Sequence, residues 1–274
     1  MRLERRIRAA AQGRDLTPQE RETLERIRPP RTYQVSPAVQ AYDGPIALLP
    51  LAQLYTRDIP ALRAPAGADL LQVLWCPFGH PPKTYMPRTV LFWRSTAEIT
   101  TVLTAPPEPP AVQYADYLPE PCLLVPEQIT EYPQELGEDL QSRVNDQRTW
   151  KAATDAVDSE CESYPGSYYA DNLSVAPGWK VGGWASWGLT DPVPQSCPAC
   201  ATTMHPLLTI STFEWDRSKR SWIPYEMQER AAAPTRAGRP RPARPTAIQI
   251  GRGYKQQLYV CPATPEHPHT ELMQ

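Results

Sequence analysis

The chain has 274 residues, a hydrophobic fraction of 41% and a formal net charge of −2. This length allows one large domain or two small ones, and the hydrophobic fraction is enough for a packed core. The near-neutral charge excludes a basic surface over the whole molecule, of the kind that binds nucleic acid. Proline supplies 34 residues, between two and three times the usual share of about 5%. The regular elements should therefore be short and joined by long ordered loops.

The first ten residues alternate charges with Leu3 and Ile7, and no apolar stretch follows them. We therefore expect no secretory signal, and the chain has no run of about 18 apolar residues that would span a membrane. These features predict a cytoplasmic protein, in which the six cysteines stay reduced. Such cysteines are buried, reactive or bound to a metal.

The chain divides into four predicted segments. Residues 1–32 form an N-terminal helical segment, because Thr17-Pro18-Gln19-Glu20 has the pattern of a capping box. Residues 33–127 form a first β-rich half, and residues 128–163, which lack proline except near their start, contain one long linking helix over 134–160. Residues 164–274 form a second β-rich half with the candidate Cys/His metal site. The predicted strands lie at 46–51, 70–75, 90–93, 207–215 and 248–260.

The two halves share a short sequence echo. Val73-Leu74-Trp75-Cys76-Pro77 matches Leu258-Tyr259-Val260-Cys261-Pro262, and each match is followed by a His-Pro pair at His80 and His267. Two strands that each end in a Cys-Pro turn indicate a duplicated unit. The predicted fold is therefore α+β and β-rich, built from two related halves with a helical appendage and a linking helix.

Four sequence stretches carry a family resemblance. They are Trp179-Lys180-Val181-Gly182-Gly183-Trp184, Cys197-Pro198-Ala199-Cys200 with Met204 and Leu207-Leu208 after it, Gly251-Arg252-Gly253-Tyr254 leading to Leu258-Tyr259-Val260-Cys261, and Leu70-Leu71-Gln72-Val73. Together they resemble the YwqG-like family of bacterial proteins over roughly residues 33–274. The resemblance implies an α+β, β-rich fold with internal duplication. It also implies a distant likeness to the programmed cell death protein 2 family, whose members chaperone a ribosomal protein. Some members of the YwqG-like family are encoded near polymorphic-toxin loci, which implies a role as immunity proteins.

The first half departs from this family pattern. Relatives carry a Gly-Gly-Pro stretch and a further Cys/His pair early in that half. Here the corresponding region, Tyr42-Asp43-Gly44-Pro45, contains neither cysteine nor histidine. We therefore expect no complete metal site in the first half.

The second half carries the best metal-site candidate. Cys197-x2-Cys200 has the spacing of a zinc knuckle, in which two thiolates bind one tetrahedral ion. Cys261 with His267 or His269 can supply the closing pair, so we predict a structural zinc site made of Cys197, Cys200, Cys261 and His267. Two alternatives remain open, a redox pair and a pair of buried, unliganded thiols. In a further alternative, Cys76 or His80 completes the site across the two halves.

Other residues support weaker hypotheses. Cys76 and His80 have the residue types of a nucleophile and its base, as in a hydrolase or transferase, although a buried thiol and a loop histidine are the simpler interpretation. Trp179, Trp184 and Trp187 fit core packing better than a ligand groove. The segment around Arg236, Arg239, Arg241 and Arg244 can bind RNA phosphates or serve as a solvated loop. Cys122 and Cys161 have no partner signature.

The sequence lacks a phosphate loop, a nucleophile elbow, a His-Glu-x-x-His motif and a dinucleotide fingerprint. We therefore predict a non-enzymatic protein-binding module, an immunity-type or chaperone-type adaptor with a structural zinc site and an unidentified protein partner. The alternatives are a Cys76/His80 hydrolase or transferase and an RNA- or ribosome-associated factor.

Overall fold

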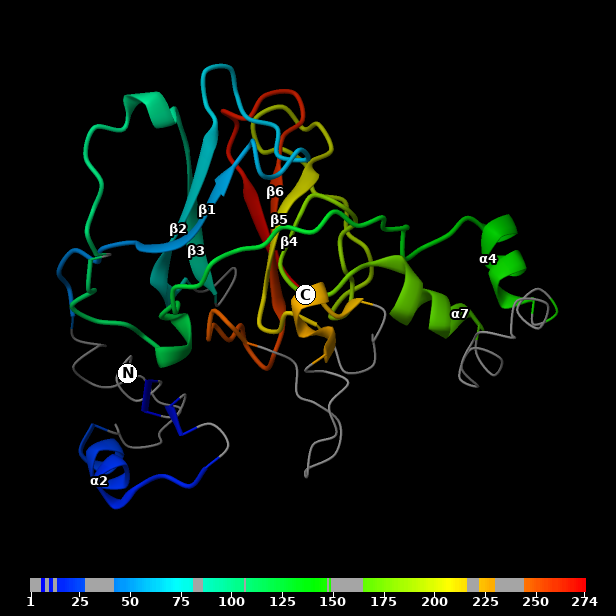
Figure 1. Cartoon of the computed structure of the whole chain (residues 1–274). Coiled ribbons are helices and arrows are strands. Elements are labelled where there is room, and N and C mark those ends of the chain that lie inside the picture. The colour runs from blue at the N-terminus through cyan, green and yellow to red at the C-terminus, as the bar shows by residue number, and fades with distance from the viewer. Residues whose placement is uncertain are drawn as a thin grey trace.

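A computed structural model describes residues 6–7, 10–11, 14–27, 42–80, 86–105, 107–146, 148, 165–215, 222–229 and 244–274. These residues form two antiparallel sheets and several short helices (Figure 1), which confirms the predicted α+β class. Within these ranges, no helix combines the length and the apolar character that crossing a membrane requires.

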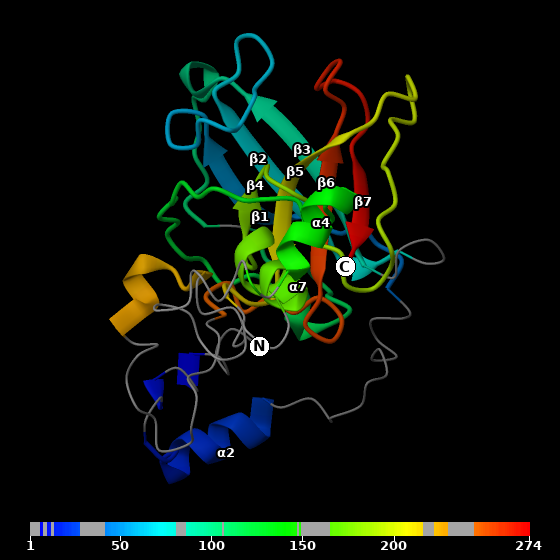
Figure 2. The same cartoon turned by 90° about the vertical axis from the view of Figure 1, so that its right-hand side faces the viewer.

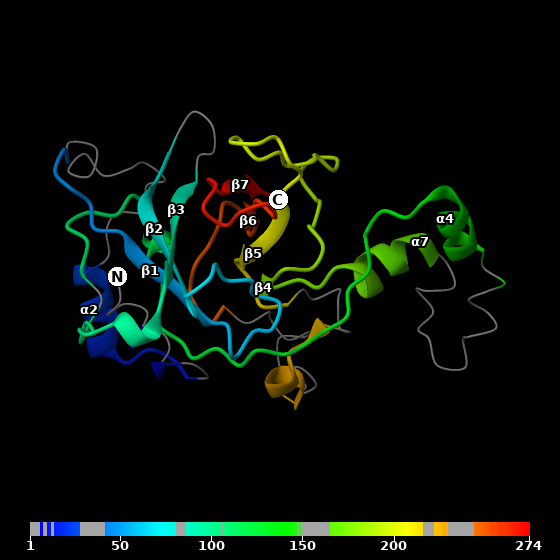
Figure 3. The ribbon, with the colours of Figure 1, turned by 90° about the horizontal axis from the view of Figure 1, so that it is seen from above.

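The two sheets lie next to each other, as the view in Figure 3 shows. The first sheet has the order β1-β2-β3 and the second has the order β4-β5-β6-β7, with every neighbouring pair antiparallel. The strands are β1 (Leu49–Tyr55), β2 (Leu70–Gly79), β3 (Pro87–Arg94), β4 (Lys180–Val181), β5 (His205–Ser211), β6 (Lys255–Val260) and β7 (Thr270–Met273). All the predicted strand regions contain or overlap one of these strands, whereas β4 and β7 were not predicted.

Proline is tolerated inside these strands at the points where the pairing is irregular. The register shifts next to Pro50 in β1, across Pro77 in β2 and next to Pro206 in β5. A proline donates no backbone hydrogen bond, so it fits a ladder only where the ladder is already broken. The central strands β2 and β5 therefore accommodate a proline at these breaks in the ladder.

One hydrophobic core joins the two sheets. Leu71, Val73 and Trp75 alternate along β2, so their side chains share one face, and all three are fully buried. They belong to the same apolar cluster as Ile210 of β5 and Leu258 of β6. The two predicted halves therefore share a core, while the internal duplication stays a prediction.

The N-terminal helix α2 (Pro18–Ile27) begins with the predicted capping box. The backbone N–H of Glu20 donates to Thr17 Oγ1 at 3.2 Å, and the N–H of Thr17 donates to the Glu20 carboxylate at 2.8 Å. These reciprocal bonds satisfy two N–H groups at the start of the helix. That α2 belongs to a separate appendage stays a prediction.

The predicted linking helix is shorter at its start than expected. α4 (Glu138–Asn145) begins after Gly137, whose backbone is extended, and residues 128–137 are not helical. Leu140, expected to face inward, is half exposed. Residues 149–164 lie outside the described part of the chain. Before the helix, the carboxylate of Glu131 is buried and pairs with Lys180 of β4 at 2.6 Å.

After this interval, α7 (Pro165–Tyr168) leads into a π-helical turn (Tyr169–Ser174). The chain then enters the second sheet at β4. In the turned view of Figure 2, β5, β6 and β7 run side by side, which brings the start of β5 next to the end of β6.

Candidate metal centre

Four side chains that are distant in sequence meet at one end of the second sheet. We call them the Cys3His cluster: Cys197, Cys200, Cys261 and His267. Their ligand atoms all lie within 4.8 Å of one another, and no other group of this kind occurs in the described ranges. These are the four residues that the sequence predicted.

The distances inside the Cys3His cluster fit a tetrahedral ion. Cys197 Sγ lies 3.4 Å from His267 Nδ1, and Cys200 Sγ lies 3.6 Å from Cys261 Sγ. A zinc ion with Zn–S bonds of about 2.3 Å and Zn–N bonds of about 2.0–2.1 Å requires edges of about 3.5 Å and 3.8 Å for these pairs. The sulfur separation is far above the S–S bond length of about 2.05 Å in a disulfide, and all three cysteines are free.

A tight turn presents the first two thiols. The isolated bridge between Ser196 and Thr203 closes this turn, and the N–H of Cys197 donates to the carbonyl of Thr202 at 2.9 Å. Ala201 has a φ of 58°, the left-handed conformation that reverses the chain after Cys200. We call residues 196–203 the knuckle; β5 begins directly after Met204.

The strand register brings the second pair to the knuckle. His205 at the start of β5 pairs with Val260 at the end of β6, so Cys261 leaves the sheet beside the knuckle. The chain then runs through His267 before it returns as β7. The β6–β7 connection, residues 261–269, therefore supplies both remaining ligands from one loop, which we call the ligand loop.

Backbone N–H groups point at the sulfur atoms in the same pattern in both loops. Those of Ala199 and Cys200 are hydrogen-bonded to Cys197 Sγ, and those of Ala263 and Thr264 are hydrogen-bonded to Cys261 Sγ. In both cases the donors follow the cysteine by two and three positions. Donors of this kind stabilise thiolate ligands and fix their orientation.

The surroundings shift the acidities of the four groups in different directions. The Thr202 side chain and its backbone N–H lower the pKa of Cys200 to about 6. Burial raises the pKa of Cys197. Burial also acts to raise the pKa of Cys261, but hydrogen bonds from the Thr264 backbone and from His267 outweigh it and lower that pKa. The hydrogen bond to Cys261 raises the pKa of His267.

The cluster is enclosed on its inner side. Cys197 is 2% exposed and Cys261 is 3% exposed, and they pack with Met204 and Tyr259, whereas Cys200 lies at the surface. Two supporting residues, Thr202 and Thr264, were not identified from the sequence. A threonine two positions after Cys200 and another three positions after Cys261 are the signal that could have found them.

Comparison with family models, with curated proteins and with solved structures gives no match for this chain. The fold and the site together define an α+β protein with a Cys3His cluster. The resemblance to the YwqG-like family stays a prediction.

Cys76 and His80 lie at different places on β2. Cys76 lies inside the strand and His80 follows its last residue, after a stretch of irregular pairing with β3 between Trp75 and Gly79. Burial raises the pKa of the Cys76 thiol and lowers the pKa of His80, so burial disfavours the thiolate–imidazolium form of such a pair. Neither residue joins the Cys3His cluster, so the alternative in which one of them completes the site is wrong.

The other histidines have different surroundings. His269 Nε2 lies 2.9 Å from Thr89 Oγ1 of β3 and 3.6 Å from the carboxylate of Glu271. It therefore connects the two sheets and is not part of the cluster. His205 is exposed at the start of β5.

The tryptophan and arginine candidates also lie in different surroundings. Trp179 packs against the core and donates its Nε1–H to the carbonyl of Ser211 at 2.9 Å, whereas Trp184 is half exposed. Arg244 lies over the ring of Phe213, with 5.7 Å from Cζ to the ring centroid. Cys122 is exposed. Arg236, Arg239, Arg241, Trp150 and Cys161 lie outside the described residues.

Proposed function

We propose that this protein is a zinc-stapled protein-binding module. The observation that carries the proposal is the convergence of the Cys3His ligand atoms at the distances of a tetrahedral site. Four protein ligands complete the coordination of zinc and leave no open position for a substrate. The ion would therefore have a structural role.

A zinc ion at this place would stabilise a weakly connected part of the fold. Cys197 of the knuckle and Cys261 of the ligand loop share a small apolar shell with Met204 and Tyr259. A structural zinc site contributes folding free energy because the unfolded chain has no preformed site. In this proposal the ion fixes the ligand loop against the end of the second sheet.

The protein-binding part of the proposal is supported by exposed apolar side chains. Leu123 is 96% exposed and Val125 is 70% exposed, and Leu124 between them is half exposed. Val102 and Leu103 form a second exposed apolar pair. Contiguous exposed apolar residues mark sites of protein interaction more often than single ones. An immunity-type or chaperone-type adaptor in the cytoplasm remains the expected biological setting.

Metal analysis of the purified full chain tests the proposal. We expect about one zinc per chain, and we expect Cys200→Ser to bind zinc at least tenfold more weakly. Cys122→Ser is the matched control, because Cys122 is also exposed but lies outside the cluster. Wild-type protein that neither retains zinc nor takes it up from a zinc buffer would overturn the proposal.

The two alternative functions have less support. Burial raises the pKa of Cys76 and lowers the pKa of His80, which disfavours the charged form of a nucleophile–base pair. Most of the arginine-rich segment lies outside the described residues, so RNA binding rests on the sequence alone.

A further inference from the structure

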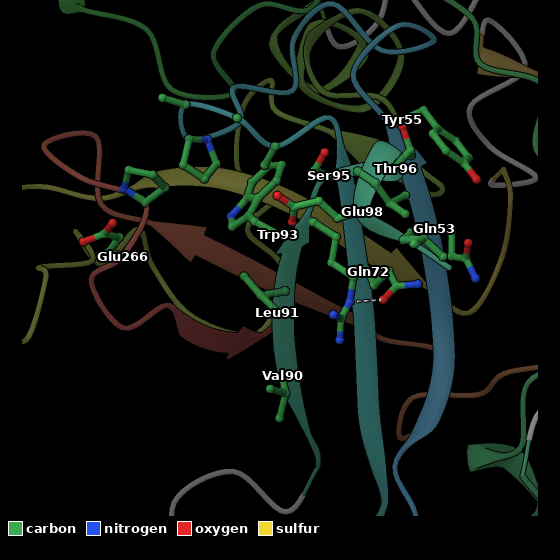
Figure 4. Close-up of a pocket in the computed structure, with 18 of the residues that line it drawn as sticks. Gln53, Tyr55, Gln72, Val90, Leu91, Trp93, Ser95, Thr96, Glu98 and Glu266 are labelled. Carbon is green, nitrogen blue, oxygen red and sulfur yellow. Dashed lines mark hydrogen bonds between the residues drawn. The ribbon is translucent and has the colours of Figure 1, made fainter. Parts of the chain in front are cut away.

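A large groove lies beside the open edge of β3 (Figure 4). Its volume is about 1430 Å³, which exceeds the 300–1,000 Å³ range typical of small-molecule sites. The groove is lined by β3, by Val260 at the end of β6 and by the ligand loop, and it extends to residues of β1, β2 and the segment 65–68. In Figure 4, Trp93 and Glu266 lie on opposite sides of this space. A third wall is the segment 95–103.

The β3 strand presents unused backbone groups along this groove. β3 is an edge strand that pairs only with β2 among the described residues. The N–H of Thr89 points away from β2, because it donates to Glu271, whereas the carbonyl of Arg94 accepts from Asp69 at 3.0 Å on the β2 side.

The direction of the remaining groups follows from the ladder. The pairing register between residues 89 and 94 is regular, and backbone groups alternate in direction along an antiparallel strand. The N–H and C=O groups of Leu91 and Trp93 therefore point outward like those of Thr89. In the described part of the chain, no hydrogen bond occupies these four outward groups. An open edge of this kind is a template for pairing with another strand.

Side chains beside this edge are suited to an apolar ligand. Leu91 and Trp93 pack partly against the core and line the groove. Val102 is 80% exposed and Leu103 is 75% exposed on the third wall. Side chains of an added strand alternate in direction, so those at every second position can reach these surfaces.

The charges on the rim favour a basic partner. Glu98 and Glu266 line opposite parts of the groove and form no ion pair with any residue that the structure describes. Arg94, the basic side chain beside them, donates to Gln72 at 2.8 Å and lies over the ring of Phe92. Arg94, His267 and His269 also line the groove, so a lysine or arginine of the partner is expected next to Glu98 and Glu266, which form no ion pair beside the apolar surface.

We propose that this groove binds an extended segment of a partner protein, which adds to β3 as a further strand. The segment carries apolar side chains at alternate positions and an adjacent lysine or arginine. Hydrogen bonds to Leu91 and Trp93 provide affinity, and the surfaces for alternate side chains provide specificity. This inference rests on the protein-binding part of the proposed function and names the partner chemistry.

The walls of the groove leave room for a single extended segment but not for the folded sheet of a second copy of the chain. A strand added to β3 has the ligand loop on its other side, where Pro265 and Pro268 line the groove. Sheet strands lie about 4.8 Å apart, so a folded sheet would need further room beyond the added strand. The ligand loop occupies that direction.

The groove also links partner binding to the metal centre. His267 belongs to the Cys3His cluster and also lines the groove. An ion bound to the cluster would therefore hold one wall in place. Removal of the ion should weaken segment binding even though the ion does not touch the segment.

The test uses zinc-loaded full chain and a phage-displayed library of random ten-residue peptides. We expect enriched peptides with alternate apolar residues and a basic residue. A synthetic enriched peptide should bind at least tenfold more weakly to a Val102→Asp, Leu103→Asp double variant. The matched control, Tyr225→Asp, changes an apolar side chain that is 74% exposed outside the groove and should bind as wild type.

Hydrogen exchange of backbone amides provides a second readout. It is measured on the unmutated protein, so the loss of a side chain cannot produce the expected result. Peptide binding should slow exchange at Leu91 and Trp93 and leave Val90 and Phe92 unchanged, because the latter two already bond to β2. The inference is overturned if no peptide is enriched, if the groove variant binds as wild type, or if Leu91 and Trp93 are already protected in a dimer without peptide.

The zinc content of each preparation separates the two proposals. Full zinc occupancy without peptide binding at β3 overturns only the groove. Peptide binding at β3 by a protein that takes up no zinc overturns only the zinc staple.

Discussion

The two Cys-Pro sequences of this chain lead to different structures. In the second sheet, Cys261 follows the last residue of β6 and meets the knuckle across the β5–β6 pairing. In the first sheet, Cys76 lies within β2, which continues to Gly79, and it belongs to no cluster of three or more metal-ligating residues in the described part of the chain. The echo in sequence therefore does not determine the chemistry. A metal site also requires a neighbouring strand that begins with a second pair of ligands.

The largest expected effect comes from replacing a ligand of the Cys3His cluster. The comparison is with Cys76, the sequence counterpart of Cys261 in the first sheet. Cys197→Ser and Cys261→Ser should each abolish stoichiometric zinc binding and lower the free energy of unfolding by at least about 3 kcal/mol, because zinc binding is coupled to folding. Cys76→Ser should lower it by less than about 1 kcal/mol. Urea denaturation with parallel metal analysis measures both. Equal losses for Cys76 and Cys261 would remove the distinction between the two sheets.

A second comparison concerns the two ends of β5. The ionisable groups before β5 lie together in the Cys3His cluster, whereas Glu214 after β5 is half-buried near the carboxylates of Glu226 and Glu127. Burial, together with the charges of Glu226 and Glu127, raises the pKa of Glu214 from 4.5 to about 7. The folded state therefore holds this proton more tightly than the unfolded state. Its contribution to stability is complete below about pH 4.5 and is lost as the pH rises through about 7.

Glu214→Gln should therefore stabilise the protein at pH 8 by up to about 3 kcal/mol, with a difference that shrinks as the pH falls toward 4.5. Urea midpoints of both proteins between pH 5 and pH 8 measure this difference. Both proteins share the same cluster, so any pH dependence of metal binding cancels between them. A difference that does not depend on pH would show that Glu214 does not titrate as described.

The knuckle itself allows a finer test. Thr202→Val removes the hydroxyl that lies 3.3 Å from Cys200 Sγ and leaves a side chain of similar shape. Zinc affinity should fall about tenfold, the lower end of the range for partners of metal ligands. Competition with a coloured chelator measures the affinity. Thr100→Val, at an exposed position in the segment 95–103, is the control and should leave the affinity unchanged.

The smallest expected effect concerns the backbone of the same turn. Ala201 has a φ of 58°, a conformation that glycine adopts without a steric cost from Cβ. Ala201→Gly should change the free energy of unfolding by no more than about 1 kcal/mol in the stabilising direction, because relief of strain exceeds the entropy cost. Thermal unfolding of zinc-loaded protein measures it. A clear loss of stability would mean that the Ala201 methyl group packs usefully against the knuckle.

Local patterns predicted much of this molecule. The apolar alternation of 70–75 identified a strand with one buried face, and Thr17 with Glu20 identified the start of α2. The spacing of Cys197 and Cys200 identified the knuckle, and the Cys-Pro echo led to Cys261. Each of these features depends on residues that are close in sequence, and this is why a single sequence reveals them.

Features that depend on distant partners were not predicted. Residues 134–137 were predicted as helix but are not helical, and the nearby Glu131 is buried against Lys180 of β4, a partner 49 positions away in sequence. β7 is short and was not recognised, although it places the ligand loop. The groove depends on which strand lies at a sheet edge, and strand order is not encoded in local periodicity.

X-ray absorption at the zinc edge tests the central claim most directly. The account predicts one zinc per chain with three sulfur neighbours at about 2.3 Å and one nitrogen neighbour at about 2.0–2.1 Å. The sulfur signal should decrease to two neighbours in any weakly loaded Cys200→Ser protein. A first shell of light atoms only, or protein that takes up no zinc, would contradict the account.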